Sequence, residues 1–184
     1  MKNIMELTIK KVTKWSPDYK KVKEILDTAF PKRELFPTWL LCFAGLLNRR
    51  IEFLLFYNRD ILVGVAYTVH TSKMVIPLYL AVDEQQRSKG YGAALLSNLK
   101  ERYEGLPLTI ETEIANLSAD NYHQRIRRIH FYEQNGFRET GWYLTDRSGK
   151  YALMSTAEHF FSDDYKNTLL SFMHGLYEIR VDNF

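Results

Sequence analysis

The sequence has little of several features that mark specialised classes of protein. It contains a single cysteine, Cys42, which excludes an internal disulfide and is expected to be a buried small hydrophobic side chain rather than a nucleophile. The apolar run at residues 39–47 is too short to span a bilayer, and residues 1–6 contain no signal-peptide hydrophobic segment. We therefore expect a cytoplasmic protein that does not enter the membrane.

Charge of either sign is not in large excess. The 184 residues include 25 Lys and Arg and 22 Asp and Glu, for a formal net charge of +3 at pH 7. This charge is small and dispersed, so it does not indicate a nucleic-acid partner. The five histidines show no ligand spacing with acids or with Cys42, and no metal is expected. The length and a hydrophobic fraction of 46% predict one domain with a sizeable core.

The periodicity of apolar residues predicts a mixed α/β chain rather than a strictly alternating one. Helices are expected between an N-cap at Ser16 and Pro31, at about 38–48, from about 91 to a stop at Gly105, and from about Ser118 to 134. Strands are expected at about 7–12, 51–57, 61–70, 75–82, 108–114, 137–144 and 150–156.

Residues 78–103 are the most informative segment. An apolar strand is predicted to end at Val82, and a polar connection with Arg87, Lys89, Gly90 and Gly92 follows. One face of the next helix carries apolar side chains four residues apart, at Tyr91, Leu95, Leu99 and Tyr103. A strand, a basic glycine turn and a helix start direct backbone N–H groups at one point, where the helix dipole favours negative charge. The segment therefore predicts a turn that binds pyrophosphate.

Two better-known phosphate loops do not fit this turn. A Walker-type loop requires Lys-Ser or Lys-Thr after its last glycine, whereas Tyr91, Gly92 and Ala93 follow Gly90. The dinucleotide fingerprint requires a third glycine where this chain has Leu95, so close packing of helix on strand is not expected there.

Two motifs together resemble the GNAT superfamily of N-acetyltransferases. Arg87-x-x-Gly90-x-Gly92 is similar to its coenzyme-A-binding motif, and residues 132–137, Tyr-Glu-Gln-Asn-Gly-Phe, resemble its later helix-to-strand element. They stand in the family's order, about 40 residues apart, which makes the pair more specific than either motif alone. The resemblance covers roughly residues 7–155.

The resemblance implies a mixed α/β fold with a central mixed, mostly antiparallel sheet flanked by helices. It implies an acetyltransferase domain at 1–157, with the strands at 75–82 and 108–114 splayed around the pantetheine arm of acetyl-CoA. The backbone of the first strand would bind pantetheine as an added strand, and the following turn would hold the pyrophosphate. The implied cofactor-binding residues are Leu80, Ala81, Val82, Arg87, Ser88, Lys89, Gly90, Tyr91, Gly92 and Ala93.

Residues 158–184 form a C-terminal extension beyond that domain. The pattern predicts a helix with an N-cap at Ser162, closed by His174 and Gly175, and a short strand at 177–181. We expect this extension to pack on its own domain. Coverage of the acceptor pocket and a contact with a second subunit in a homodimer are the alternatives.

The chemistry implied is direct transfer of acetyl to a primary amine in a ternary complex. No Cys or Ser constellation supports a covalent intermediate. Tyr132 matches the residue that donates a proton to the departing thiolate in the family. Alternatively, it is a structural aromatic side chain in the helix stripe of Tyr122, Ile126 and Ile129. The acceptor is expected to be a small or amino-acid-like amine, with a protein N-terminus or a lysine side chain as the alternative.

The base is assigned less directly. Ile76 stands where some relatives carry a catalytic glutamate, so Glu111 and Glu113, on one face of the next strand, are the candidates. An exposed acidic strand face is the alternative. Glu34 and His70 are candidates for binding the acceptor; a solvated loop acid and a structural histidine are the alternatives.

One position departs from the family. Arg125 stands where relatives often have an asparagine that contacts pantetheine, with Arg127 and Arg128 beside it. These arginines either reach the coenzyme phosphates or form a solvated basic face. The departure keeps open a second reading, a non-catalytic acyl-CoA-binding sensor or partner module. A nucleotide-binding protein is disfavoured because the Walker lysine is missing.

Overall fold

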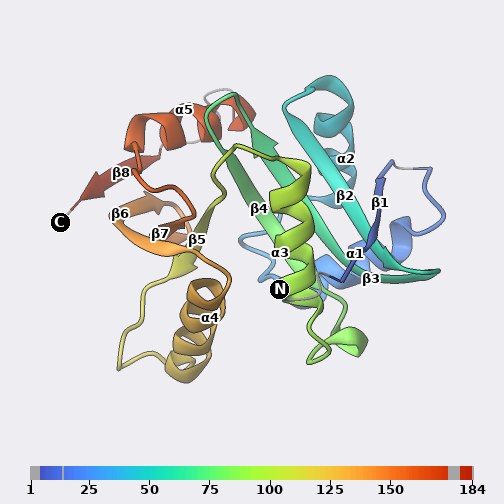
Figure 1. Cartoon of the computed structure of the whole chain (residues 1–184), viewed down its shortest axis with the longest axis horizontal. Coiled ribbons are helices and arrows are strands. Elements are labelled where there is room, and N and C mark those ends of the chain that lie inside the picture. Colours follow the sequence, from blue (N-terminus) through green and yellow to red (C-terminus); the bar gives the residue numbers. More distant parts are fainter. Residues whose placement is uncertain (1–4, 14, 174–178, 184) are drawn as a thin grey trace. The chain divides into compact units, whose positions relative to one another are not determined.

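The structure, a computed structural model, describes residues 5–13, 15–173 and 179–183, and it confirms the mixed α/β fold (Figure 1). The elements in chain order are β1 (Thr8–Lys11), α1 (Tyr19–Ala29), α2 (Thr38–Leu47), β2 (Ile51–Asn58), β3 (Ile61–His70), β4 (Val75–Val82), a 3₁₀ turn (Glu84–Gln86), α3 (Tyr91–Arg102), β5 (Thr109–Glu113), α4 (Tyr122–Gln134), β6 (Arg138–Asp146), β7 (Gly149–Ser155), α5 (Ser162–Met173) and β8 (Arg180–Asn183).

The chain divides into two compact units. The first contains the described residues up to His70 together with Pro77–Glu104, and the second contains Thr71–Ile76 and the described residues from Gly105 onward. The strands form two four-stranded sheets, in the orders β1-β2-β3-β4 and β5-β7-β6-β8. An isolated parallel bridge joins Val75 to Leu108. The strand pairs β1–β2, β2–β3, β5–β7, β6–β7 and β6–β8 are antiparallel.

The centre of the first unit is buried on both faces of its sheet. Seven successive residues of β2 and eight of β3 are buried, and because successive side chains point to opposite faces, both faces must be covered. In Figure 1, α3 lies across this sheet. Its stripe Tyr91, Leu95, Leu99 and Tyr103 is buried, as the sequence predicts.

The close approach of α3 to the sheet corrects one expectation. A Cβ atom added at Gly64 of β3 would lie 2.6 Å from the carbonyl oxygen of Ala81 and 2.8 Å from Cδ2 of Leu95. The helix is therefore tightly packed at Leu95 although the third glycine of the dinucleotide fingerprint is missing. The glycine that allows this contact lies on the strand instead of the helix.

Two helix starts differ from the sequence-based expectation. Helix α1 begins after Asp18, and Ser16 is not its cap, because its Oγ accepts a hydrogen bond from the Thr13 N–H at 2.9 Å. Helix α4 begins at Tyr122 instead of near Ser118. The N–H and hydroxyl of Ser118 both donate to Oδ1 of Asn116, at 3.0 and 2.8 Å, which holds this segment in a local turn.

In the second unit, β5 and β6 flank β7, and β8 pairs with β6. The C-terminal extension thus supplies the fourth strand of this sheet. Helix α5 begins at Ser162, as expected, with Asp163 and Asp164 in its first turn. The expected helix stop at His174 and Gly175 and the start of the expected strand at 177 lie outside the described residues. The strand itself spans Arg180–Asn183, later than predicted.

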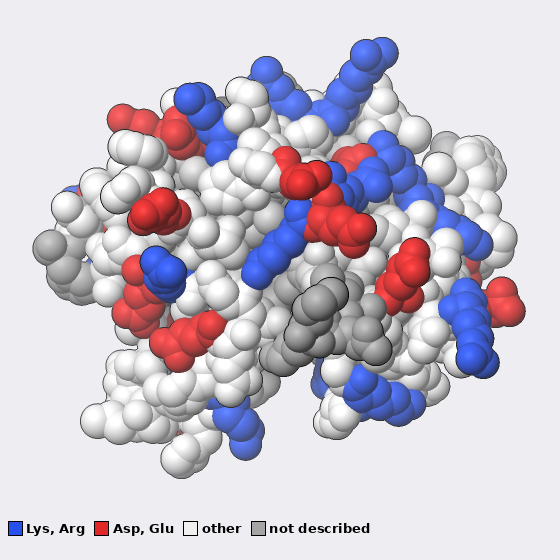
Figure 2. Space-filling model, viewed as in Figure 1, with Lys and Arg blue, Asp and Glu red and all other residues white. Residues whose placement is uncertain are grey.

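Within the described ranges, no helix combines the length and the apolar character that crossing a membrane requires. The same residues include no group of three or more His, Cys, Asp or Glu side chains arranged to hold a metal ion. Cys42 is buried, as expected. Figure 2 shows positive and negative side chains interspersed on the face in view.

Candidate functional site

The predicted pyrophosphate turn begins at a buried acid. Asp83 follows β4 directly, and its Oδ1 accepts a hydrogen bond from the N–H of Gln85 at 3.4 Å. Lys21 of α1 forms an ion pair with the same carboxylate, at 3.1 Å to Oδ2. These contacts hold the start of the turn against the body of the first unit.

The turn contains two residues in the left-handed region, Ser88 with φ 64° and Gly90 with φ 82°. Left-handed residues within a turn direct neighbouring N–H groups into one concavity, which is a common anion site. Gly90 is the N-cap residue of α3, and no described side chain caps this helix start. Its first N–H groups are thus available to an external anion, where the helix dipole also favours negative charge.

The two basic side chains of the turn are exposed, whereas its tyrosine is buried. Arg87 and Lys89 are exposed; Arg87 forms a long ion pair with Glu84 at 3.9 Å, and Lys89 Nζ donates to the Gln85 carbonyl at 3.2 Å. Tyr91 is instead buried, and its hydroxyl accepts a hydrogen bond from Nδ2 of Asn58 at 2.7 Å. Tyr91 therefore anchors the first turn of α3, while the two cations lie at the surface beside it.

Strand β4 is the last strand of its sheet, next to β3. Leu80 and Val82 are partly exposed, and Ala81 between them is buried. An edge strand offers backbone groups to an added extended segment, which suits the predicted binding of pantetheine at Leu80–Val82.

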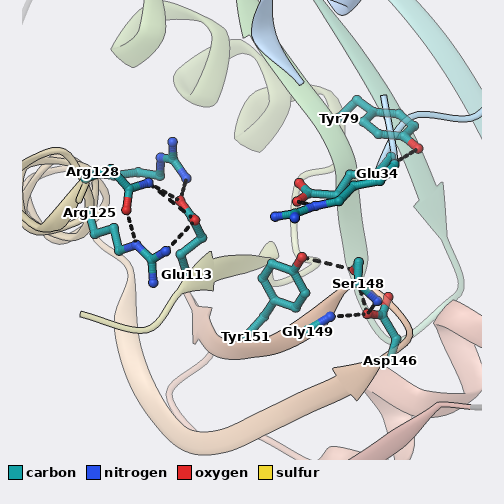
Figure 3. Close-up of polar contacts among 11 residues, drawn as sticks. Glu34, Tyr79, Glu113, Arg125, Arg128, Asp146, Ser148, Gly149 and Tyr151 are labelled. Carbon is teal, nitrogen blue, oxygen red and sulfur yellow. Dashed lines mark hydrogen bonds and ion pairs between the residues drawn. The ribbon is translucent and has the colours of Figure 1, made fainter. Parts of the chain in front are cut away.

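The linker between α1 and α2 is attached to β4 through Tyr79, a residue that no sequence motif marks. The buried Tyr79 hydroxyl donates to the Glu34 carbonyl at 2.9 Å and accepts from the Phe36 N–H at 3.2 Å (Figure 3). Its ring packs edge-to-face on Phe30, with centroids 5.0 Å apart. Tyr79 thus fixes the backbone at Glu34, whose carboxylate pairs with Arg33 at 3.3 Å.

His70, at the end of β3, lies beside a different cluster. Its ring is 5.3 Å from the ring of Tyr103, and burial lowers its pKa, opposed mainly by the charge of Glu52. These surroundings favour the structural alternative for His70.

In the second unit, Glu113 is held by two arginines of α4. Its carboxylate forms ion pairs with Arg125 and Arg128, each at 3.0 Å (Figure 3). Arg125 also donates to Oδ1 of Asn121 at 2.7 Å and to the carbonyl of Ile114 at 2.9 Å. Arg125 and Arg128 are therefore engaged by Glu113 at the end of β5, whereas Arg127 beside them is exposed.

Glu111, on the same face of β5, has different neighbours. Its Oε1 accepts a hydrogen bond from the hydroxyl of Tyr165 on α5, at 2.5 Å. Burial raises the pKa of Glu111 to about 7, the Tyr165 hydrogen bond opposes that rise, and the charge of Asp146 adds to it. A carboxyl group with a pKa near neutrality exchanges protons readily at physiological pH. The sequence pattern indicates Glu111 but neither Tyr165 nor Asp146.

Tyr132 lies in the last turn of α4. Its ring packs edge-to-face on Phe131 and Phe137, with centroids 5.2 and 5.5 Å away. Burial raises its pKa, and the nearby Arg128 opposes that rise. Its carbonyl accepts the N–H of Phe137 at 3.1 Å across the left-handed Gly136. No residue of α4 is fully buried, so the stripe to which Tyr132 would alternatively belong is only partly covered.

The structure groups the predicted residues by unit. The first unit holds the pyrophosphate turn, the edge of β4, Glu34 and His70. The second holds Glu111, Glu113 and Tyr132, and Arg128 is a neighbour of both Glu113 and Tyr132. Tyr79, Tyr165 and Asp146 were missed because their importance depends on partners that are distant in the sequence.

Comparison with known proteins places this arrangement in a family. Residues 49–139 match the family described as the acetyltransferase (GNAT) domain. A GNAT-family protein from Bacteroides thetaiotaomicron is similar over 92% of this chain and 98% of its own, with 20% identity and a TM-score of 0.74. No curated protein matches the sequence.

Two further solved structures share the fold. A Bacillus subtilis acetyltransferase in complex with CoA has 17% identity, a TM-score of 0.57, and coverage of 82% of this chain and 97% of its own. The ribosomal-protein-S18-alanine N-acetyltransferase of Escherichia coli has 19% identity, a TM-score of 0.59, and coverage of 85% and 96%. Residues 49–139 therefore form a GNAT acetyltransferase domain, and the chain shares the fold of solved GNAT acetyltransferases.

Proposed function

We propose that this protein is an acetyl-CoA-dependent N-acetyltransferase that transfers acetyl directly to a primary amine in a ternary complex. The observation that carries the proposal is the turn at 83–93, in which two left-handed residues precede an uncapped helix start. Support comes from the match to the GNAT domain and from a relative that is described in complex with CoA. The small or amino-acid-like acceptor is part of the proposal.

The donor would be held by backbone groups. The N–H groups at Arg87–Ala93 bind the pyrophosphate, with Arg87 and Lys89 supplying positive charge, and the free edge at Leu80–Val82 binds the pantetheine amides. Because most of these contacts come from the main chain, affinity depends on the backbone conformation of the turn more than on any one side chain.

Proton transfer would use two groups of the second unit. Glu111 accepts the proton that the ammonium of the acceptor must lose, directly or through water, since its pKa of about 7 suits that task. We prefer Glu111 to Glu113 because both oxygens of Glu113 already face guanidinium groups. Tyr132 donates a proton to the departing thiolate, and Glu34 is the candidate to bind the cationic acceptor.

Calorimetry with acetyl-CoA and a thiol-release assay against a panel of amines test this function. Binding of acetyl-CoA with thiol release on at least one amine is the expected result. Binding without turnover on any amine would favour the non-catalytic sensor module instead. Failure to bind acetyl-CoA would refute both.

Matched glycine variants test the turn. Gly90→Ala forces a side chain into φ 82°, and we expect the Kd for acetyl-CoA to rise by about tenfold, since such strain costs about 1–2 kcal/mol. Gly105→Ala is the control: Gly105 has φ 80°, follows the other end of α3, and like Gly90 has no atom within 4 Å of an added Cβ. Equal Kd values for the two variants would argue against the turn as the donor site.

A further inference from the structure

A buried hydroxyl of the C-terminal extension meets the acid that we propose as the base. Tyr165, in the first half of α5, has no exposed surface, and its hydroxyl donates to Oε1 of Glu111 at 2.5 Å. The two residues are 54 positions apart in the sequence. Within the described part of the chain, Glu111 forms no ion pair.

The surroundings of Glu111 differ from those of a structural carboxylate. Among the described residues, the ionisable groups that shift the pKa of Glu111 are Tyr165 from α5 and the acid Asp146 from the end of β6, and Glu113 lies two residues along its own strand. Glu113 receives two guanidinium groups, whereas Glu111 receives one neutral donor and a like charge. A carboxyl group that served only packing would be better placed beside a cation or replaced by an uncharged side chain.

We propose that Tyr165 is a positioning residue for acetyl transfer, whose hydroxyl orients the Glu111 carboxyl group and stabilises its charged form. This proposal rests on the proposed function, in which Glu111 is the base. The hydrogen bond occupies Oε1 and leaves Oε2 to take the proton from the amine or from a bridging water. Tyr165 keeps its own proton, because burial and the charge of Glu111 raise its pKa well above 10. The C-terminal extension thereby contributes to the reaction.

Helix α5 also offers a matched control. The hydroxyl of Thr168, fully buried on the same helix, lies 2.9 Å from the hydroxyl of Thr71. Thr168→Val removes a buried hydroxyl from α5 without altering any group that faces Glu111. Tyr165→Phe removes a buried hydroxyl of the same helix that does face it.

The first experiment titrates Glu111 in the full-length protein and requires no acceptor. Carbon-13 NMR of protein labelled at glutamate carboxyls follows Glu111 from pH 4 to 10, with Glu111→Gln to assign its signal. In Tyr165→Phe the midpoint should rise by about one pH unit, because the charged form loses a hydrogen-bond donor. In Thr168→Val it should stay at the parent value. An unchanged midpoint in Tyr165→Phe, or an equal shift in both variants, would overturn the proposal.

The second experiment follows kcat/KM against pH with an amine that the parent enzyme acetylates. In Tyr165→Phe the acidic limb should move upward by the same amount, with about a fivefold loss at pH 7 that disappears above pH 9. The KM for acetyl-CoA should not change. A loss that is equal at every pH would mean that Tyr165 acts only on stability.

The two readouts separate this inference from the proposed function. A shifted NMR midpoint with an unshifted rate profile would show that Tyr165 lowers the pKa of Glu111 but that Glu111 is not the base. The role of Tyr165 in acetyl transfer would then be refuted. A parent protein that acetylates no amine would refute the proposed function, and the NMR titration would still decide whether Tyr165 controls the charge of Glu111.

Discussion

Glu52 in the first unit and Glu111 in the second are both glutamates on strands, yet their surroundings have opposite effects on their charge. Burial alone would raise the pKa of Glu52, but hydrogen bonds from Arg102, Lys11 and Tyr103 outweigh it and lower the pKa to about 2. Arg102 donates two hydrogen bonds, both at 2.7 Å, and the Tyr103 hydroxyl donates a third at 2.6 Å. Burial of Glu111 is opposed only by the hydrogen bond from Tyr165, and its pKa rises to about 7.

The two sets of surroundings suit two different tasks. The Glu52 carboxylate is charged at every physiological pH, and its ion pairs link β2 to α3 and β1, which stabilises the fold. A carboxyl group that is half-charged near pH 7 contributes little to stability and is suited to proton transfer. The same residue type thus acts as a structural link in one unit and, on our proposal, as a base in the other.

The strongest test of this comparison is the rate of Glu111→Gln. We expect kcat to fall by about 10²- to 10⁴-fold, since the amide cannot accept the proton, whereas Glu52→Gln should leave kcat of the folded enzyme within about twofold of the parent. Thiol release under saturating acetyl-CoA measures both. Similar kcat losses in the two variants would mean that Glu111 has no catalytic role that Glu52 lacks.

Tyr132→Phe tests the other proton-transfer group of the second unit. Removal of the phenol hydroxyl should lower kcat by about 10²-fold, because the thiolate then leaves without its proton donor. The Kd for acetyl-CoA from calorimetry should change much less than kcat. Equal turnover in mutant and parent would remove Tyr132 from the mechanism.

Glu52→Gln should lower the free energy of unfolding at pH 7 by about 3 kcal/mol, because it leaves Arg102 and Lys11 beside a neutral group. Urea unfolding measures this loss. Thr145→Ser, a conservative change of a partly exposed residue of β6, is the reference variant and should remain near the parent. A loss below about 1 kcal/mol for Glu52→Gln would show that the network contributes little.

The pH dependence of unfolding should have opposite signs at the two acids. The folded pKa of Glu52 lies below the unfolded value, so its stabilisation is present above about pH 5 and is lost as the pH falls toward 2. The folded pKa of Glu111 lies above the unfolded value, so its charged form costs stability as the pH rises from about 4 to above 7.

Glu111→Gln should therefore stabilise the protein by about 1 kcal/mol or more at pH 8, with little effect at pH 4. Urea unfolding of parent and variant at both pH values checks this difference. Stabilisation at pH 4 as large as at pH 8 would contradict the raised pKa of Glu111.

Much of the fold follows from local patterns. The bounds of β4 match the prediction, 75–82, because an apolar run ends at a polar turn, and the buried stripe of α3 follows from four-residue spacing. The starts of α1 and α4 could not be predicted in this way. Ser16 and Ser118 have the side chains of helix caps, but nearby Thr13 and Asn116 bind them instead.

The candidate site shows the same division. The turn at 87–93 was predictable because its glycines, charges and helix start are adjacent in the sequence. Tyr79 could not be assigned, because its role depends on a linker more than 40 residues earlier in the chain, at Glu34 and Phe36. From the sequence, Arg125 and Arg128 could be identified only as part of a basic helix face, and not as the ion-pair partners of Glu113.

The sequence alone determined the order of the elements, the glycine-containing turn before α3 and the resemblance to the GNAT family, since these depend on residues a few positions apart. Only the tertiary structure decided the charge states of Glu52 and Glu111. Arg102 reaches Glu52 across 50 positions and Tyr165 reaches Glu111 across 54. A carboxyl pKa depends on burial and on the groups within a few ångströms, and only folding brings those groups together.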